Sequence, residues 1–175
     1  MPVLGVHKEI KVQRPIASDE LNIFYNSVGE AVWQIQYLEH AIVSFVVIKR
    51  HKRKPSSVKE AYERLETERK GTLGSLYGRA KDEGIIPDNL KPRFDKLISE
   101  RNWLIHDSRT MNSEDLYNDE KTCSIINRIE SITNESKSLT REILQLLETF
   151  MSSEEFDLGE AYRMAESKLR DLKGA

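Results

Sequence analysis

Three residues near the middle of the chain have side chains suited to chemistry on a phosphate group. They are Arg101, Asn102 and His106, and they lie in the stretch ERNWLIHDS at 100–108. Histidine, with an unperturbed pKa of about 6.5, exchanges protons near neutral pH. A guanidinium stays charged and can donate two hydrogen bonds to phosphate oxygens, while the asparagine amide could orient the imidazole. These groups are what metal-independent RNA cleavage needs, in which the ribose 2′-hydroxyl attacks the adjacent phosphate.

The helical pattern places Arg101 in an unexpected environment. On a wheel with 100° steps it falls near the centre of an apolar arc about 120° wide. That arc contains Leu90, Phe94, Leu97, Ile98, Leu104 and Ile105, with Trp103 on the opposite side. A buried guanidinium without a partner costs several kcal/mol, so Arg101 must either pair with a carboxylate, Glu100 or a glutamate on another helix, or face a hydrated cleft. The wheel alone leaves both interpretations open.

The spacing within the motif favours a second copy of the chain. Arg101 and His106 are about 140° apart on an ideal helix, so one copy presents them poorly to a single phosphate. Two copies related by a twofold axis could bring both pairs of residues to one cleft.

The rest of the chain predicts helices to hold this motif. Runs with helical periodicity are separated by caps, prolines and glycines, and no run has the period of two typical of a strand. The expected helices span about 19–50, 56–69, 72–84, 90–107, 119–152 and 157–172. We therefore expect an all-α fold, an antiparallel bundle of four to five helices, forming a twofold homodimer. The expected organisation is an N-terminal arm (1–18), the bundle (19–152) and an appended C-terminal helix (153–175).

The two long helices are expected to pack along a shared seam, because their apolar residues recur at spacings of three and four. In the helix at 19–50 a second apolar stripe joins the first, formed by Ala41, Val43, Val46 and Val47. A helix that is hydrophobic on all sides must be covered on more than one side, and a second copy is a natural cover. The sequence marks Ser18 with Asp19 and Glu20 as the start of this helix.

A dense basic cluster at the end of the same helix could bind RNA. It contains Lys49, Arg50, Lys52, Arg53 and Lys54. Such residues can neutralise the phosphates of a nucleic acid backbone, but cations also suit a helix C-terminus for local reasons. Both interpretations stay open.

Composition restricts the remaining function classes. The chain has 175 residues with 27 basic and 29 acidic side chains, so its overall field does not attract a polyanion. The single cysteine, Cys123, cannot form an internal disulfide and is expected to be a small buried residue in a reducing compartment. The most apolar run, 41–48, is shorter than the roughly 20 residues of a membrane span. We expect a cytoplasmic protein with no membrane contact, metal or cofactor.

The stretch from Arg101 to His106, RNWLIH, resembles the R-x4-6-H motif of the HEPN family, in the form where asparagine follows the arginine. The TLGSL segment at 72–76 and the IHD ending are also similar, and the resemblance covers roughly 19–152. It implies an α-helical homodimer whose motif helices meet at the dyad, forming a metal-independent ribonuclease site. By position, Arg101, Asn102 and His106 would be its catalytic residues.

The resemblance also implies partners. Many HEPN members are toxins or effectors of defence against phage, so a cognate antitoxin or regulatory protein is expected beside the RNA substrate. In one toxin subgroup a tyrosine two positions after the histidine accepts nucleotides, but here Ser108 occupies that place. Other members bind nucleotides or partners without cutting RNA. The leading hypothesis is a metal-independent endoribonuclease; the alternatives are a non-catalytic helical dimer that binds a nucleotide or a partner, and a structural subunit of a defence complex.

Overall fold

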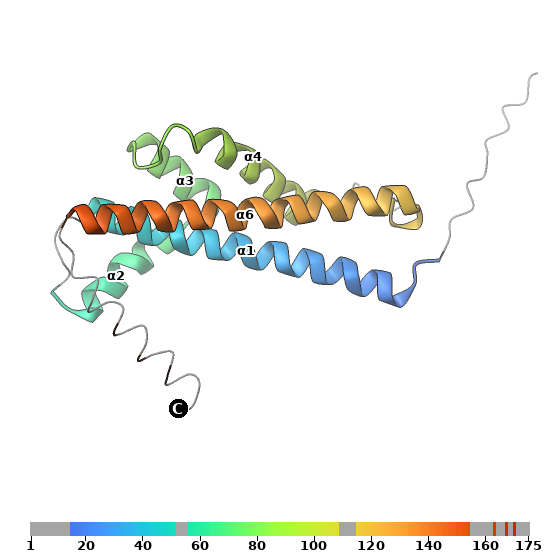
Figure 1. The fold of residues 1–175 in the computed structure, drawn as a ribbon, viewed down its shortest axis with the longest axis horizontal. Helices are drawn as coiled ribbons and strands as arrows, with labels where there is room; N and C mark the ends of the chain where they lie inside the picture. The colour runs from blue at the N-terminus through green and yellow to red at the C-terminus, as the bar shows by residue number, and fades with distance from the viewer. Residues whose placement is uncertain are drawn as a thin grey trace, which may run out of the picture.

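The computed structural model describes residues 15–51, 56–108 and 115–154, together with the single positions Arg163, Ser167 and Arg170 (Figure 1). These residues form helices joined by turns and contain no strand, which confirms the all-α class. The elements are α1 (Ser18–Arg50), α2 (Val58–Arg69), α3 (Leu73–Asp82), α4 (Lys91–Asn102), the π-helical segment η1 (Trp103–Asp107), the 3-10 turn η2 (Asp115–Tyr117) and α6 (Asp119–Ser153). Most of the expected arm and of the expected C-terminal helix lie outside the described residues, although Arg163, Ser167 and Arg170 are helical.

Local signals set most of the helix ends. The Ser57 hydroxyl accepts from the Glu60 N–H at 3.1 Å and caps α2, and the Thr72 hydroxyl caps α3 in the same way. Gly84, with a φ of 67°, ends the turn after α3 in the left-handed region. The start of α1 differs from expectation: its cap position is Ala17, whose N–H donates to Glu20 Oε2 at 2.9 Å, so Ser18 is already helical.

The two long helices, α1 and α6, lie side by side as expected, but they run in the same direction (Figure 1). Lys137 of α6 contacts Glu30 of α1 at 2.6 Å, and near the other end Lys49 lies 4.1 Å from the ring centroid of Phe150. Residue numbers therefore rise together along the pair. The expected antiparallel arrangement is wrong for these two helices, because three shorter helices between them return the chain to the end where α1 begins.

The core is formed within one chain. The seam of α1 is buried at Ala31, Ile35, Leu38, Ile42 and Phe45 against Ile129, Ile132, Leu139 and Ile143 of α6. The second stripe of α1, Ala41 with Val43, Val46 and Val47, is buried as well, because α2 and α3 pack on that side of the helix. A second copy is therefore not needed to cover α1, and that argument for a homodimer is wrong.

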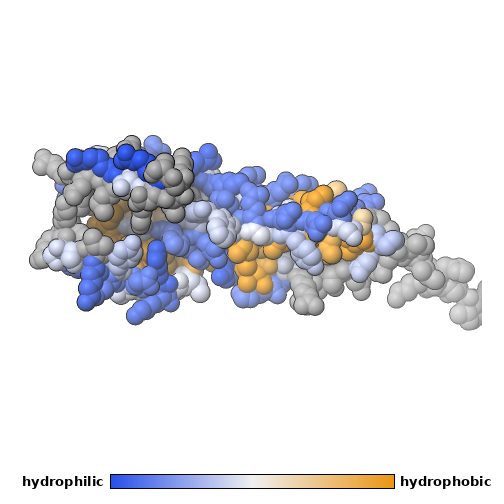
Figure 2. Space-filling view, turned by 90° about the horizontal axis from the view of Figure 1, so that it is seen from below, coloured by the Kyte–Doolittle hydropathy of each residue, from blue (hydrophilic) through white to orange (hydrophobic). Residues whose placement is uncertain are grey.

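The surface of the bundle is mostly hydrophilic, with separate hydrophobic patches on the face seen in Figure 2. Among the described residues, the large apolar or aromatic side chains that stay exposed are Ile23, Tyr25, Trp33, Tyr37, Tyr62, Ile105, Tyr117 and Leu144. Ile105 belongs to the motif segment, so its exposure bears on the candidate site.

Helix α1 also meets the length and composition of a membrane span. It holds an 18-residue window of mean hydropathy 1.3, and half of that window is buried inside the bundle. A long core helix of a water-soluble bundle has the same properties, so this window does not distinguish the two. The cytoplasmic location stays a prediction.

Candidate functional site

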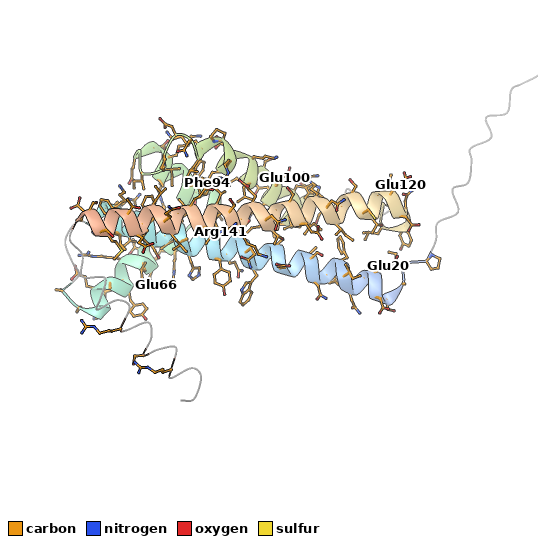
Figure 3. The ribbon with its side chains drawn as sticks, viewed as in Figure 1. Glu20, Glu66, Phe94, Glu100, Glu120 and Arg141 are labelled. Carbon is orange, nitrogen blue, oxygen red and sulfur yellow. The ribbon has the colours of Figure 1, made fainter. Side chains whose placement is uncertain are left out.

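The motif segment follows a firmly anchored helix, α4. Phe94 is fully buried and stacks on Tyr77 of α3, with 5.0 Å between ring centroids, and the Tyr77 hydroxyl donates to the Lys91 carbonyl at 3.1 Å. On the other flank, Arg93 Nε donates to Glu135 of α6 at 2.7 Å. Figure 3 shows Phe94 and Glu100 on α4 beside α6. These contacts fix the helix that carries Arg101.

The backbone leaves the α-helical pattern inside the motif. Residues Trp103–Asp107 are π-helical, and the Ser108 N–H donates to the carbonyl of Trp103, five residues earlier. The Ser108 hydroxyl donates to the Leu104 carbonyl at 2.6 Å and so helps to hold the wide turn. Single π-turns inside α-helices are rare and are often found at functional sites.

The helical wheel fails for two residues of the motif segment. Trp103 was expected on the outer side, but it is only 7% exposed, whereas Ile105 was expected in the buried arc and is 44% exposed. Leu90, Phe94, Leu97 and Leu104 are buried as expected. The wheel does not show which sides of a helix are covered by other helices, and here Arg128 of α6 lies 3.7 Å from the ring centroid of Trp103. The expectations for Trp103 and Ile105 are therefore wrong.

Arg101 is partly buried, and its guanidinium donates through Nη1 to Asn102 Oδ1 at 3.3 Å. Within the described residues it forms no ion pair. The carboxylate nearest in sequence, Glu100, is already paired: Arg128 of α6 donates to it through Nε at 2.6 Å and Nη2 at 3.2 Å. Arg101 thus does not pair with Glu100, one of the carboxylates considered from the sequence, and the interpretation that it faces a hydrated cleft stays a prediction. Among the described residues, no carboxylate pairs with the charge of Arg101.

Asn102 and His106 are both exposed. The Asn102 amide oxygen is occupied by the guanidinium of Arg101, and within the described residues the imidazole makes no hydrogen bond. The structure thus brings Arg101 and Asn102 into contact, while His106 stands apart on the π-turn. Because the steps of a π-turn are smaller than 100°, the angle between Arg101 and His106 falls below the 140° of an ideal helix.

The basic cluster is largely engaged where the structure describes it. Arg50 Nε donates to Glu83 at 2.6 Å, and its other nitrogens pair with Glu83 and Glu68, which raises its pKa, mainly through Glu83. Lys49 lies over Phe150. These contacts tie the end of α1 to α2, α3 and α6. Lys52, Arg53 and Lys54 lie outside the described residues, so RNA binding by this cluster stays a prediction.

Arg128 is the residue near the motif that sequence reasoning missed. Besides pairing with Glu100, its guanidinium lies 3.7 Å from the ring centroid of Trp103. It also lines an open groove of about 550 Å³ between α4 and α6, together with Lys96, Leu97, Ser131, Ile132 and others. No local pattern could have indicated these contacts, because the partners are 25 to 28 positions apart in sequence.

Cys123 also departs from expectation, since it is exposed instead of buried. It lies near the start of α6, where the described neighbouring helices no longer cover every side of the helix.

Comparisons with known proteins give no relative from which a function could be transferred. No model of a protein family matches the chain, and neither the curated proteins nor the solved structures contain a match. The resemblance to the HEPN family therefore stays a prediction that depends on the motif and its geometry.

Proposed function

We propose that this protein is a metal-independent endoribonuclease of the HEPN type, with a composite active site formed by two copies of the chain. One observation carries the proposal: Arg101 lies beside Asn102 and next to a π-turn without an ion pair among the described residues, while the adjacent carboxylate, Glu100, is held by Arg128. A charge kept apart from a nearby acid in this way is suited to binding an anionic group.

Each motif residue has a chemical role in this proposal. His106, exposed on the π-turn, removes the proton of the ribose 2′-hydroxyl or protonates the leaving 5′-oxygen. Arg101 stabilises the negative charge that builds on the phosphate oxygens in the transition state. Asn102 accepts a hydrogen bond from Arg101 and so orients the guanidinium. The products would carry a 2′,3′-cyclic phosphate and a 5′-hydroxyl.

Ile105 supports the pairing of two copies at the motif. It is 44% exposed, and it lies in sequence between Arg101 and His106, where an exposed isoleucine has no role in the chemistry. In a twofold dimer the same patch meets itself, so Ile105 of each copy would be covered and the two motifs would lie at one cleft. Sedimentation should show a dimer that Ile105→Asp dissociates; a wild-type monomer at micromolar concentration would contradict the composite site.

The experiment for activity uses purified protein and single-stranded RNA in excess EDTA. We expect wild type to cut the RNA and His106→Ala to lose about 100-fold or more of the rate, the contribution typical of a general acid or base. The matched control is His40→Ala, because His40 is also exposed but lies on α1, where its Nδ1 is 3.3 Å from Arg69. Its rate should stay unchanged.

Arginine variants complete this test. Arg101→Ala should abolish cleavage, whereas Arg141→Ala, which removes an exposed arginine from α6, should not (Figure 3). The variants at His40, His106 and Arg141 should melt within about 2 °C of wild type, since exposed substitutions usually change stability by less than about 0.5 kcal/mol, and Arg101→Ala, at a partly buried position, should keep the helical circular dichroism of wild type. If wild type leaves RNA intact, or if His106→Ala cuts as fast as wild type, the ribonuclease proposal is wrong.

A second candidate function is a non-catalytic partner-binding module, and one observation favours it. Trp33 and Tyr37 on α1 are each more than half exposed, with rings in edge-to-face contact at 6.1 Å. Exposed aromatic side chains of this kind are enriched in protein interfaces. Intact RNA in the cleavage assay, combined with a partner whose binding is lost in Trp33→Ala, would favour this function. A cognate antitoxin or regulatory protein would be the corresponding partner if the protein acts as a toxin or defence effector.

A further inference from the structure

Arg128 of α6 contacts the residue before Arg101 and the residue after Asn102. Its guanidinium pairs with Glu100 through two nitrogens, at 2.6 and 3.2 Å, and its central carbon lies 3.7 Å from the ring centroid of Trp103. Glu100 and Trp103 are three positions apart, so they lie on one face of the helix. One side chain therefore bridges the last α-helical turn and the first residue of the π-turn.

The two contacts need the particular shape of a guanidinium. Its planar group can donate two parallel hydrogen bonds to a carboxylate along its edge while its face lies on an aromatic ring. A lysine ammonium has no such plane and could keep only one of the contacts well. Because Trp103 is nearly buried, its stacking on Arg128 is shielded from solvent on the ring side.

The pairing with Glu100 has a second consequence. Glu100 is the acid nearest to Arg101 in sequence, and the Arg101 guanidinium already bonds its other chain neighbour, Asn102, at 3.3 Å. Arg128 thus occupies the carboxylate that would otherwise compete with an anionic ligand for Arg101. The same contact holds the helix against α6 at the point where the backbone widens.

We propose that Arg128 is a positioning residue for the motif: by holding Glu100 and Trp103 it fixes the π-turn and keeps Arg101 free for phosphate. The catalytic part of this inference depends on the ribonuclease function proposed above. The geometric part does not, since it concerns the environment of Trp103 in the free protein.

The kinetic test compares the full-length Arg128→Ala and Arg128→Lys variants with wild type. We expect kcat for RNA cleavage to fall by about 10- to 100-fold in both, as a displaced catalytic group would produce, with KM changed less than about 2-fold. Arg128→Ala combined with Glu100→Gln should recover part of the rate, because the freed carboxylate no longer competes for Arg101. Arg141→Ala, on the same helix but away from the motif, is the control. Unchanged kcat in folded Arg128→Lys and Arg128→Ala would overturn the positioning role.

A fluorescence test decides the geometric part without any cleavage. The chain has two tryptophans, and in a Trp33→Phe background Trp103 is the only one left. Adding Arg128→Ala should shift its emission to longer wavelength and increase quenching by acrylamide, and Arg128→Lys should give an intermediate change. Unchanged emission and quenching would overturn the proposed role of Arg128 in covering Trp103. If wild type does not cut RNA but the emission shifts as expected, the ribonuclease proposal fails, while the positioning of Trp103 by Arg128 is supported.

Discussion

Replacing Arg93 by alanine should lower the free energy of unfolding by about 1–2 kcal/mol, because Arg93 connects the motif helix α4 to α6 through three contacts. Its Nε donates to Glu135 at 2.7 Å, its Nη2 donates to the Ser138 hydroxyl at 2.9 Å, and its Nη1 pairs with Glu142. Together these carboxylates raise the pKa of Arg93, with Glu135 contributing most. The substitution removes all three contacts at once.

The size of the effect follows from exposure. A hydrogen bond to a charged group contributes about 1.5–3 kcal/mol when shielded, whereas exposed ion pairs contribute about 0.2–1 kcal/mol. The side chains of Arg93, Glu135 and Glu142 are each roughly one third exposed, so screening moves each contact toward the lower range. Three contacts of about 0.5 kcal/mol each give about 1.5 kcal/mol. Water can hydrate the carboxylates left behind, so no large desolvation penalty is added.

Urea unfolding followed by circular dichroism would measure this change, with an unchanged m-value and a melting temperature lower by roughly 3–6 °C. About half of the loss should disappear in 1 M NaCl, where the Debye length is about 3 Å. Lys137→Ala is the control, since its single, more exposed pair with Glu30 should cost less than about 0.5 kcal/mol. A loss below about 0.3 kcal/mol for Arg93→Ala would refute the reasoning, and so would a loss as large as that of a buried ion pair, about 3–5 kcal/mol.

Three further predictions concern other parts of the fold. Hydrogen bonds from Ser56 lower the pKa of Glu60 to about 2. The ionised carboxylate therefore stabilises the fold fully above about pH 4.3, its pKa in the unfolded chain, and this stabilisation is lost as the pH falls toward 2. The free energy of unfolding of Glu60→Gln should accordingly depend less on pH between about 5 and 2.5 than that of wild type. Ile129→Ala, in the seam and fully buried, should cost about 2–5 kcal/mol in urea unfolding. Gly84→Ala, at a φ of 67°, should destabilise by about 1 kcal/mol, while Gly78→Ala, inside α3 with open space at its Cβ position, should stabilise by about 0.5–1 kcal/mol.

Helix positions could be predicted from the sequence because their signals are local. The caps at Ser57 and Thr72 and the stop at Gly84 act within a few residues, and the observed bounds of α2 and α3 follow from them. The direction of α6 relative to α1 has no such signal, since a seam with spacings of three and four is the same read in either direction. The cover of the second stripe on α1 was likewise unpredictable, because it depends on where two short helices fold back.

The residues of the candidate site were predictable by type and spacing, but their environments were not. A helical wheel carries no information on which sides other helices cover, so it could not anticipate that Trp103 lies against Arg128 of α6 or that Ile105 is exposed. The partner of Glu100 could not be predicted either, because Arg128 lies 28 positions away on another helix. Residue type and spacing therefore indicate the candidate groups, whereas the fold determines which contacts each of them makes among the described residues.

The case for a second copy now depends on the motif instead of on α1. With the second stripe of α1 covered by α2 and α3, the apolar residue that still needs an explanation at the candidate site is Ile105. Ile105 is exposed within the π-turn, and the smaller steps of this turn reduce the angle between His106 and Arg101, so one segment presents an apolar side chain together with a better-aligned pair of polar groups. A π-turn costs helical hydrogen-bond geometry; the Ser108 hydroxyl bonds the Leu104 carbonyl within it, and Arg128 lies over Trp103 at its start. A distortion held in place from two sides is better explained by a role at this surface than by packing inside the bundle.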